Sequence, residues 1–304
     1  MGGDDRAVKR GVGFGLLVLY VVWGSTYLAI RYGLESIPPF AMSGLRYAAA
    51  GAILLAVAKA RGASRIAARD LVPAFTCGAL LLLCGNGGVV WAEQRVSSGL
   101  AALLVAIEPL FIVLLQALPP ERHAPSGRAL AGVALGLSGV ALLLGPARLG
   151  GERIDLLGAA VVLFAAFAWA LGSLLSRRFA PPASPLQATA LQMLAGGVLL
   201  LALSLLTGEW ASFWPAHVSA RSWAALLHLL FFGSLLGYTV YMWLLRAASP
   251  ALVSTYAFVN PAVAMFLGWA LAAEPVTPRT LLAAAVIVWA VILITLAEMR
   301  RRPT

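Results

Sequence analysis

The chain has 304 residues, of which 61% are hydrophobic and only 11% are charged, and its net charge is +10. A soluble globular domain carries about 25% charged residues, so this composition argues against an ordinary soluble protein and favours an integral membrane protein. The basic residues stand in short clusters between apolar runs, without the interleaved aromatic residues of a nucleic-acid-binding patch. We therefore expect no nucleic-acid partner.

Apolar runs of about 20 residues recur along the whole chain, and each is long enough to cross a bilayer as a helix. They are predicted to be helices, because backbone polar groups cannot stay unpaired in lipid and the alternating pattern of a membrane β-barrel is absent. The connections between them are short. The sequence predicts an all-α integral membrane protein with ten membrane-spanning helices, over residues 12–33, 38–59, 71–91, 97–118, 127–146, 156–177, 185–206, 222–245, 250–271 and 279–298.

The basic residues also indicate how these helices are oriented. If the N-terminus lies inside, fifteen of the 22 Lys and Arg residues fall in segments on the cytoplasmic side and six fall outside, while Arg46 alone lies within a span. Cytoplasmic loops of membrane proteins carry an excess of Lys and Arg. Both termini are therefore predicted to be cytoplasmic.

The second half of the chain repeats the first. At an offset of 146, Trp23 falls on Trp169 and "PFAMSGLRYAAAGAILL" falls on "PLQATALQMLAGGVLLL". At an offset of 152, Glu108-Pro109 falls on Asn260-Pro261. We predict two repeats of five helices each, over residues 1–150 and 151–304. Because five is odd, the repeats would insert in opposite senses, which is typical of secondary transporters that bind their substrate near the midplane.

Two ionised side chains, Arg46 and Glu108, are predicted to lie well inside spans. Each costs at least about 2.5–3.5 kcal/mol at the centre of a membrane helix, so each should face a partner or a watered cavity. Three interpretations stay open: they line a solute pathway, where they bind zwitterion ends or carry a proton; they form a structural ion pair; or Glu108 is neutral and hydrogen-bonded between helices. The second half carries Gln192 and Asn260 at the matching places, so any role of charge is asymmetric.

Proline and glycine predict irregular helices near these polar residues. Pro109 removes one backbone hydrogen bond and should kink its helix beside Glu108. Pro261 repeats this device beside Asn260, and we treat both prolines as candidate hinges. The segment "GNGG" (85–88) lacks the rest of a phosphate-binding loop. It is interpreted as flexible or unwound, with Asn86 facing a cavity.

Aromatic residues recur at helical spacing around the predicted cavity. Tyr20, Trp23 and Tyr27 form one stripe, and Trp23 and Trp169 lie near the centres of their spans, where contact with solute and simple packing are equally good interpretations. Tryptophans near span ends are predicted to anchor at the membrane interface: Trp91, Trp214, Trp223 and Trp243. Glycines predicted to mark close helix packing are Gly132, Gly136, Gly139, Gly196 and Gly197. The candidate cavity residues are Trp23, Tyr27, Arg46, Asn86, Glu108, Trp169, Ser173, Gln192, Tyr238, Tyr256 and Asn260.

Three stretches carry a family resemblance: "WGSTYLAIRYGLESIPPFAMSGLRYAAAGAILL" (23–55), "GNGGVVWAEQRVSSGLAALLVAIEPLF" (85–111) and "SPALVSTYAFVNPAVAMFLGWALAAEPV" (249–276). They resemble EamA-type members of the drug/metabolite transporter superfamily. The resemblance implies a ten-helix secondary transporter of the bacterial inner membrane that exports amino acids or other small metabolites. Within the family, the chain is similar to exporters of amino acids, including aromatic ones. The family pattern also places Glu121 and Glu274 at helix ends, where we expect structural roles.

Enzyme motifs are missing from the sequence. His123, His217 and His228 have no metal-ligand spacing, and no HExxH or GxSxG motif occurs. We expect no catalysis, no cofactor and no metal, and the partners expected are a small solute and the lipid bilayer. A monomer is the default state, with a homo-oligomer as the alternative. A channel, an exporter of other metabolites or drugs, proton exchange and facilitated diffusion all stay open as alternatives.

The predicted orientation can be tested with single cysteines placed near Gly2 and Arg302. Both should resist a membrane-impermeant thiol reagent in intact cells, because both termini are expected to be cytoplasmic. Permeabilised cells supply the control, since each cysteine should then react. Labelling of either position from outside would overturn the orientation.

Overall fold

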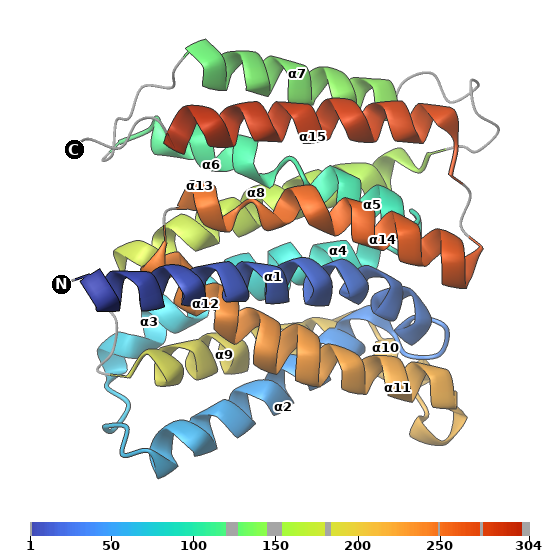
Figure 1. The fold of residues 1–304 in the computed structure, drawn as a ribbon. Coiled ribbons are helices and arrows are strands. Elements are labelled where there is room, and N and C mark those ends of the chain that lie inside the picture. The colour runs from blue at the N-terminus through green and yellow to red at the C-terminus, as the bar shows by residue number, and fades with distance from the viewer. Residues whose placement is uncertain are drawn as a thin grey trace.

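The computed structural model describes residues 2–119, 127–144, 154–179, 184–248, 250–273 and 276–299, and these residues form helices and turns without any strand. The start of α1 (Gly2–Gly33) and the end of α15 (Pro278–Met299) lie at the same end of the helix bundle (Figure 1). Within the described residues, seven helical segments are long and apolar enough to cross a membrane. The chain is thus an all-α protein built for a bilayer.

The seven apolar segments coincide with runs predicted from the sequence, with ends that differ by at most three residues. They are Arg10–Gly33 in α1, α2 (Pro39–Ala60), Ala68–Ala92, Ser98–Gln116, α8 (Leu156–Arg178), α9 (Pro185–Leu206) and Ala220–Ala247. The other three predicted runs hold α7 (Gly127–Leu144), α14 (Tyr256–Ala272) and α15. Their crossing of the membrane stays a prediction, and so does the total of ten. Between α9 and the next long segment lie two short helices, α10 (Glu209–Ser212) and η2 (Pro215–His217).

Two long segments contain a wide helical turn at matching places in the two halves. The first is built from α3 (Ala68–Cys77), η1 (Gly78–Gly87) and α4 (Gly88–Ala92), and the second from α11 (Ala220–His228), η3 (Leu229–Tyr238) and α12 (Thr239–Ala247). Both η1 and η3 are π-helices of ten residues. π-helices are rare and occur mostly as single turns at functional sites.

The π-helix η1 corrects one sequence prediction. The segment at 85–88 is not unwound: its first three residues close η1 and Gly88 begins α4. The physical reason is that i→i+5 bonding keeps the backbone groups paired, as a membrane interior demands. Glycine in this stretch therefore widens the helix rather than ending it.

The helices α2 and α9 pack with almost no space between their backbones. A Cβ atom added to Gly51 would lie 2.7 Å from the backbone nitrogen of Leu194, and one added to Gly197 would lie 2.5 Å from that of Ala48. As positions rise along α2 they fall along α9, so the two helices run antiparallel. Small residues permit this close approach in membranes. The packing role predicted for Gly197 is confirmed.

A second antiparallel pair, α7 and α15, lies side by side at one edge of the bundle (Figure 1). A Cβ atom on Gly136 would lie 3.5 Å from Ala290, and one on Gly139 would lie 2.7 Å from a side-chain carbon of Ile287. These two glycines, like those of α2 and α9, serve close helix contact. Their predicted role in packing is confirmed.

The span that holds Glu108 is broken beside Pro109, as predicted. It consists of α5 (Ser98–Val105) and α6 (Glu108–Gln116), joined by a turn at Ala106 and Ile107. The Ile107 N–H donates to the Leu104 carbonyl at 3.2 Å, so the α-helical ladder is interrupted there. Pro109 lies in the first turn of α6, where its missing N–H is harmless.

The second half places its break elsewhere. The short helix α13 (Pro250–Val253) ends before Ser254 and Thr255, and α14 then continues through Pro261 without interruption. The expectation that Pro261 interrupts its helix as Pro109 does is therefore wrong. Movement at either proline stays a prediction.

Helix ends on the predicted outer side are capped by acidic side chains. Glu209 accepts hydrogen bonds from the backbone N–H groups of Phe40 and Ala41, at 3.2 and 2.8 Å, and so ties α10 to the first turn of α2. A carboxylate there also suits the helix dipole. Glu121 and Glu274, for which the family pattern implies helix-end roles, lie outside the described residues.

Asp155 caps α8 in the same way. Its carboxylate accepts from the Gly158 N–H at 2.7 Å and from Arg95 at 3.1 Å. These bonds, the Gly158 one first, hold the pKa of Asp155 below its ordinary value. Arg95 also lies 4.9 Å above the ring of the half-buried Trp91, whereas Trp214, Trp223 and Trp243 are exposed.

The tight contact of α2 with α9 predicts that Gly197→Val prevents normal assembly. The added methyl groups meet backbone atoms, which cannot move aside, so the cost should exceed the about 1–3 kcal/mol of an overpacked core. The measurement is the fraction of monodisperse protein in detergent and its melting temperature.

The matched control is Gly13→Val, where an added Cβ atom meets nothing within 4 Å. This variant carries the same change in helix propensity without the clash. Equal melting temperatures for the two variants would contradict the packing account.

Candidate functional site

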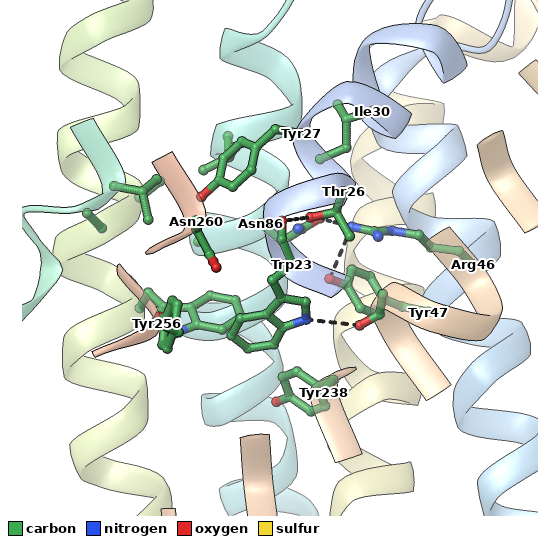
Figure 2. Close-up of a pocket in the computed structure, with 17 residues that line it drawn as sticks. Trp23, Thr26, Tyr27, Ile30, Arg46, Tyr47, Asn86, Tyr238, Tyr256 and Asn260 are labelled. Atoms are coloured by element: carbon green, nitrogen blue, oxygen red, sulfur yellow. Dashed lines mark hydrogen bonds between the residues drawn. The ribbon is translucent and has the colours of Figure 1, made fainter. Parts of the chain in front are cut away.

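A cavity lies where helices of both halves of the chain meet (Figure 2). Its volume is about 80 Å³, which is below the range of about 300–1,000 Å³ for small-molecule sites, so a solute as large as an amino acid requires the walls to move apart. Its walls come from α1, α2, η1, α4, α5, α8, η3 and α14. The lining residues are Trp23, Thr26, Tyr27, Ile30, Arg46, Tyr47, Gly85, Asn86, Val89, Val105, Ala165, Ala166, Trp169, Gly233, Tyr238, Tyr256 and Asn260.

Trp23 is the centre of an aromatic cluster in this wall. Its ring meets Trp169 at 5.6 Å and Tyr256 at 5.0 Å, both edge to face, and it meets Tyr241 at 5.0 Å with a tilt. Its indole N–H donates to the carbonyl of Gly233 at 3.2 Å. Aromatic pairs of this kind add about 0.5–1.5 kcal/mol each beyond the area they bury. The cluster therefore joins α1 to α8, η3, α12 and α14.

Arg46 brings a positive charge to the cavity. The side chain is buried, and its Nη2 donates to Asn86 Oδ1 at 2.5 Å and to the Tyr47 hydroxyl at 3.1 Å. Its guanidinium carbon lies 4.4 Å from the centroid of the Tyr47 ring, a distance that allows a cation–π contact. Its Nε is buried without a hydrogen-bond partner.

Glu108 lies behind the cavity wall. Its side chain is buried and does not line the cavity. The Tyr256 hydroxyl donates to its Oε2, while its Oε1 has no hydrogen-bond partner. Tyr256 does line the cavity, so this tyrosine stands between the carboxylate and any solute. Arg46 hydrogen-bonds to other groups, and the predicted alternative of a direct ion pair with Glu108 is wrong.

Two more predicted residues support the lining from behind. Ser173 shares a hydrogen bond of 2.6 Å with the Tyr241 hydroxyl, which accepts from the Trp169 indole at 3.0 Å. Gln192 accepts from the Tyr238 hydroxyl at 3.0 Å. These contacts fix the polar tips of aromatic rings whose faces form the wall.

The π-helix η1 brings its backbone to the cavity through glycine. A Cβ atom on Gly85 would lie 2.8 Å from a ring carbon of Trp169, so only glycine lets η1 approach that ring. In η3, a Cβ atom on Gly237 would lie still closer to the indole nitrogen of Trp23. The wide turns thus allow the two large rings to lie against helix backbone.

Of the eleven residues predicted from the sequence, eight line the cavity and three lie one hydrogen bond behind it. The three are Glu108, Gln192 and Ser173, whose hydroxyl donates to the Trp169 carbonyl at 2.6 Å. Contact of any of the eleven with a solute stays a prediction. Sequence reasoning missed nine lining residues: Thr26, Ile30, Tyr47, Gly85, Val89, Val105, Ala165, Ala166 and Gly233. Thr26 and Ile30 could have been found by extending the helical stripe from Trp23.

The part of the chain that the structure describes offers no obvious place for a metal. No group of three His, Cys, Asp or Glu side chains in these residues is arranged to hold an ion. His228 instead shares a hydrogen bond of 3.1 Å with Ser25. The cavity can therefore bind a solute through one cation, a few amides and hydroxyls, and aromatic surface.

Comparison with protein families gives two matches to one family model. The model is described as the EamA-like transporter family, and it matches residues 10–145 and 156–296. Each match covers one half of the chain, which agrees with the repeated sequence pattern.

Curated relatives match over most of their own length. A relative from Escherichia coli (strain K12), "Uncharacterized inner membrane transporter YedA", is 41% identical, with 93% of this chain and 90% of the relative covered. "Probable terminal-alkyne amino-acid exporter" of Streptantibioticus cattleyicolor is 30% identical, with 94% of both chains covered. "Probable amino-acid metabolite efflux pump" of Salmonella typhimurium is 28% identical, with 98% of both covered.

A solved crystal structure has the same fold. It covers 96% of this chain and 99% of its own, with a TM-score of 0.66 and 24% identity. At that identity the likeness concerns the fold alone.

If Trp23 and Trp169 contact solute, Ala at either position should weaken transport by about tenfold or change which solutes are preferred, since the aromatic surface that packs against the solute is lost. Phe at either position should keep most of the transport activity, because it keeps an aromatic ring. The measurement is solute uptake into proteoliposomes, together with the yield of folded protein. The exposed Trp289 supplies the control Trp289→Ala. Unchanged uptake by both Ala variants would assign the two rings to packing.

Glu108→Gln should leave solute exchange and its response to a pH gradient unchanged, because Gln still accepts the bond from Tyr256. Glu108→Leu removes that acceptor and leaves a buried hydroxyl unpaired, at a cost of about 1–3 kcal/mol, so this variant should lose folded protein. Counterflow and gradient-driven accumulation in proteoliposomes measure the first effect.

Two results would contradict this purely polar role. A Gln variant that exchanges normally but ignores a pH gradient would make Glu108 a proton carrier. A Gln variant in which solute binding and exchange fall together would make it a ligand for the solute.

Proposed function

Since this chain belongs to the EamA-like transporter family, as its sequence resemblance predicted, we propose that it exports small organic solutes as a secondary transporter, with amino acids, including hydrophobic and aromatic ones, as the leading substrates. The chain is a multi-pass protein of the inner membrane, where its relative YedA is also placed. Membership of a transporter family is established, and the proposal concerns the solute, the direction and the mechanism of transport.

The observation that carries the proposal is the cavity shared by both halves of the chain. It combines the Arg46 guanidinium, which suits a carboxylate, with the rings of Trp23, Tyr256 and Trp169, which suit an apolar or aromatic side chain. A free amino acid has both features. The names of the two exporters from Streptantibioticus and Salmonella support the same class of solute.

Alternating access between two inverted repeats is the proposed mechanism. Helices α2 and α9, which the sequence offset of 146 aligns, run antiparallel across a close glycine contact. Helices α7 and α15 do the same at the edge of the bundle. Antiparallel packing of matching helices is what two repeats of opposite sense would produce, with the substrate held between them.

The alternative is an exporter of other metabolites or of drugs. The observation that favours it is the apolar and aromatic character of most of the wall, which would accept a flat molecule without a carboxylate. The two candidates differ in their need for Arg46. A solute without a carboxylate would be transported equally well by Arg46→Gln, whereas an amino acid would not.

Reconstitution of the purified full chain in liposomes tests the proposal. Labelled amino acids should show saturable counterflow: an unlabelled amino acid trapped inside should drive transient accumulation of the label. A pore would give neither saturation nor counterflow. Recovery of the solute chemically unaltered would separate transport from catalysis. Failure of every amino acid, with counterflow of another metabolite or drug, would select the alternative.

A further inference from the structure

We infer that the cavity selects its solute by the carboxylate alone, so that organic carboxylates without an α-amino group belong to the substrate class together with amino acids. This inference rests on the proposed function and narrows its chemistry. It follows from the positive charge that lines the cavity and from the position of the carboxylates behind the wall.

Among the described residues that line the cavity, Arg46 is the one side chain with a full charge at neutral pH. The others are aromatic, aliphatic, amide or hydroxyl residues. A guanidinium stays protonated in proteins and forms its strongest hydrogen bonds with carboxylate and phosphate oxygens. In a space of low polarity its charge acts over a longer distance than in water. The wall therefore attracts an anion and repels a cation.

Arg46 is held in place and still has donor capacity. Asn86 and the Tyr47 hydroxyl both bind its Nη2, and the Tyr47 ring lies 4.4 Å from the guanidinium carbon. Its Nε is a buried donor without an acceptor. A buried charged donor that lacks a partner is costly, and a carboxylate oxygen that reached it when the wall opens would supply the missing acceptor. Asn86 and Tyr47 thus act as positioning residues for a carboxylate site.

An ammonium group finds no matching partner in the wall. Glu108 is screened by Tyr256, whose hydroxyl is already committed to it. Glu93 is also buried and does not line the cavity. Asn260 offers an amide, which binds an ammonium less strongly than a carboxylate does. The wall gives an α-amino group no charged anchor.

The aromatic rings do not replace that anchor. A ring face attracts a cation by about 0.5–2 kcal/mol, whereas a hydrogen bond to a charged group contributes about 1.5–3 kcal/mol. Trp23 also meets both Trp169 and Tyr256 edge to face, at 84° and 86°, so part of the ring surface in this cluster is covered. Removal of the amino group from a solute should therefore cost little affinity, whereas removal of the carboxylate should cost much.

Three probes of one shape test this inference on the purified full chain: L-phenylalanine, 3-phenylpropionate, which lacks the amino group, and phenethylamine, which lacks the carboxylate. Equilibrium binding of each is measured by scintillation proximity in detergent. The first two should bind with similar affinity, and phenethylamine should bind at least about tenfold more weakly, because it loses a charge-assisted hydrogen bond.

Variants locate the effect. Arg46→Gln should weaken the binding of both carboxylates by about tenfold or more, and it should strengthen rather than weaken the binding of phenethylamine, because it removes a repelling positive charge. Arg46→Lys should recover part of the loss for the carboxylates, since Lys keeps the charge without the planar fork. The control is Arg61→Gln, an exposed arginine just beyond the end of the same helix, which should bind all three probes like the native chain.

The native chain alone can overturn the inference, whether or not the variants fold. It fails if phenethylamine binds as tightly as 3-phenylpropionate, if phenylalanine binds much more tightly than 3-phenylpropionate, or if no probe binds at millimolar concentration. Counterflow in liposomes separates it from the proposed function. If the three probes bind in the predicted order but show no counterflow, the proposed transport function fails and the inference about the carboxylate stands. If phenylalanine shows counterflow but 3-phenylpropionate does not bind, the inference about the carboxylate fails and the proposed transport function stands.

Discussion

A guanidinium buried in a hydrocarbon-embedded bundle is the constraint around which the centre of this protein is organised. Arg46 cannot be neutralised, so its guanidinium must find partners within the bundle. Asn86 reaches it from η1, and Tyr47 covers it from the next position of α2. The helix that carries the charge is fixed in turn against α9, because glycine brings the two backbones into contact.

The aromatic wall obeys the same requirement that polar atoms be paired away from water. Four of the rings that face the cavity send their polar tips to partners on other helices: Trp23 to Gly233, Trp169 to Tyr241, Tyr238 to Gln192 and Tyr256 to Glu108. Apolar ring surface is then left toward the cavity. The polar residues behind the wall shape the site without touching what it holds.

Much of the fold could be predicted because hydropathy and periodicity report directly on burial in lipid. The break beside Pro109 was predictable, since proline removes a defined hydrogen bond. The earlier break before Tyr256 was not, because the ladder there ends at Ser254 and Thr255 without a proline to mark it. The π-helices were equally hidden, since no residue pattern separates i→i+5 from i→i+4 bonding.

In the candidate site, residues of unusual chemistry could be predicted from the sequence, whereas residues that line the cavity only because of their position could not. Large or charged residues such as Trp23 and Arg46 stood out as anomalies in an apolar span. Tyr47 escaped because its importance comes from its neighbour, and Ala165 because small residues line a cavity by leaving room. Glu108 was predicted to line the cavity, but it lies behind the wall. Its burial within a span could be predicted from the sequence, whereas the position of Tyr256 between it and the cavity could not.

The paired wide turns also carry information about ancestry. An inserted residue in a membrane helix rotates everything beyond it, and such an insertion would seldom be accepted twice independently at the same place. η1 and η3 nevertheless occupy matching positions in two repeats whose sequences have otherwise drifted apart. The simplest history is that the π-turn arose once, in an ancestor of about half this length, and that gene duplication then preserved it in both descendants.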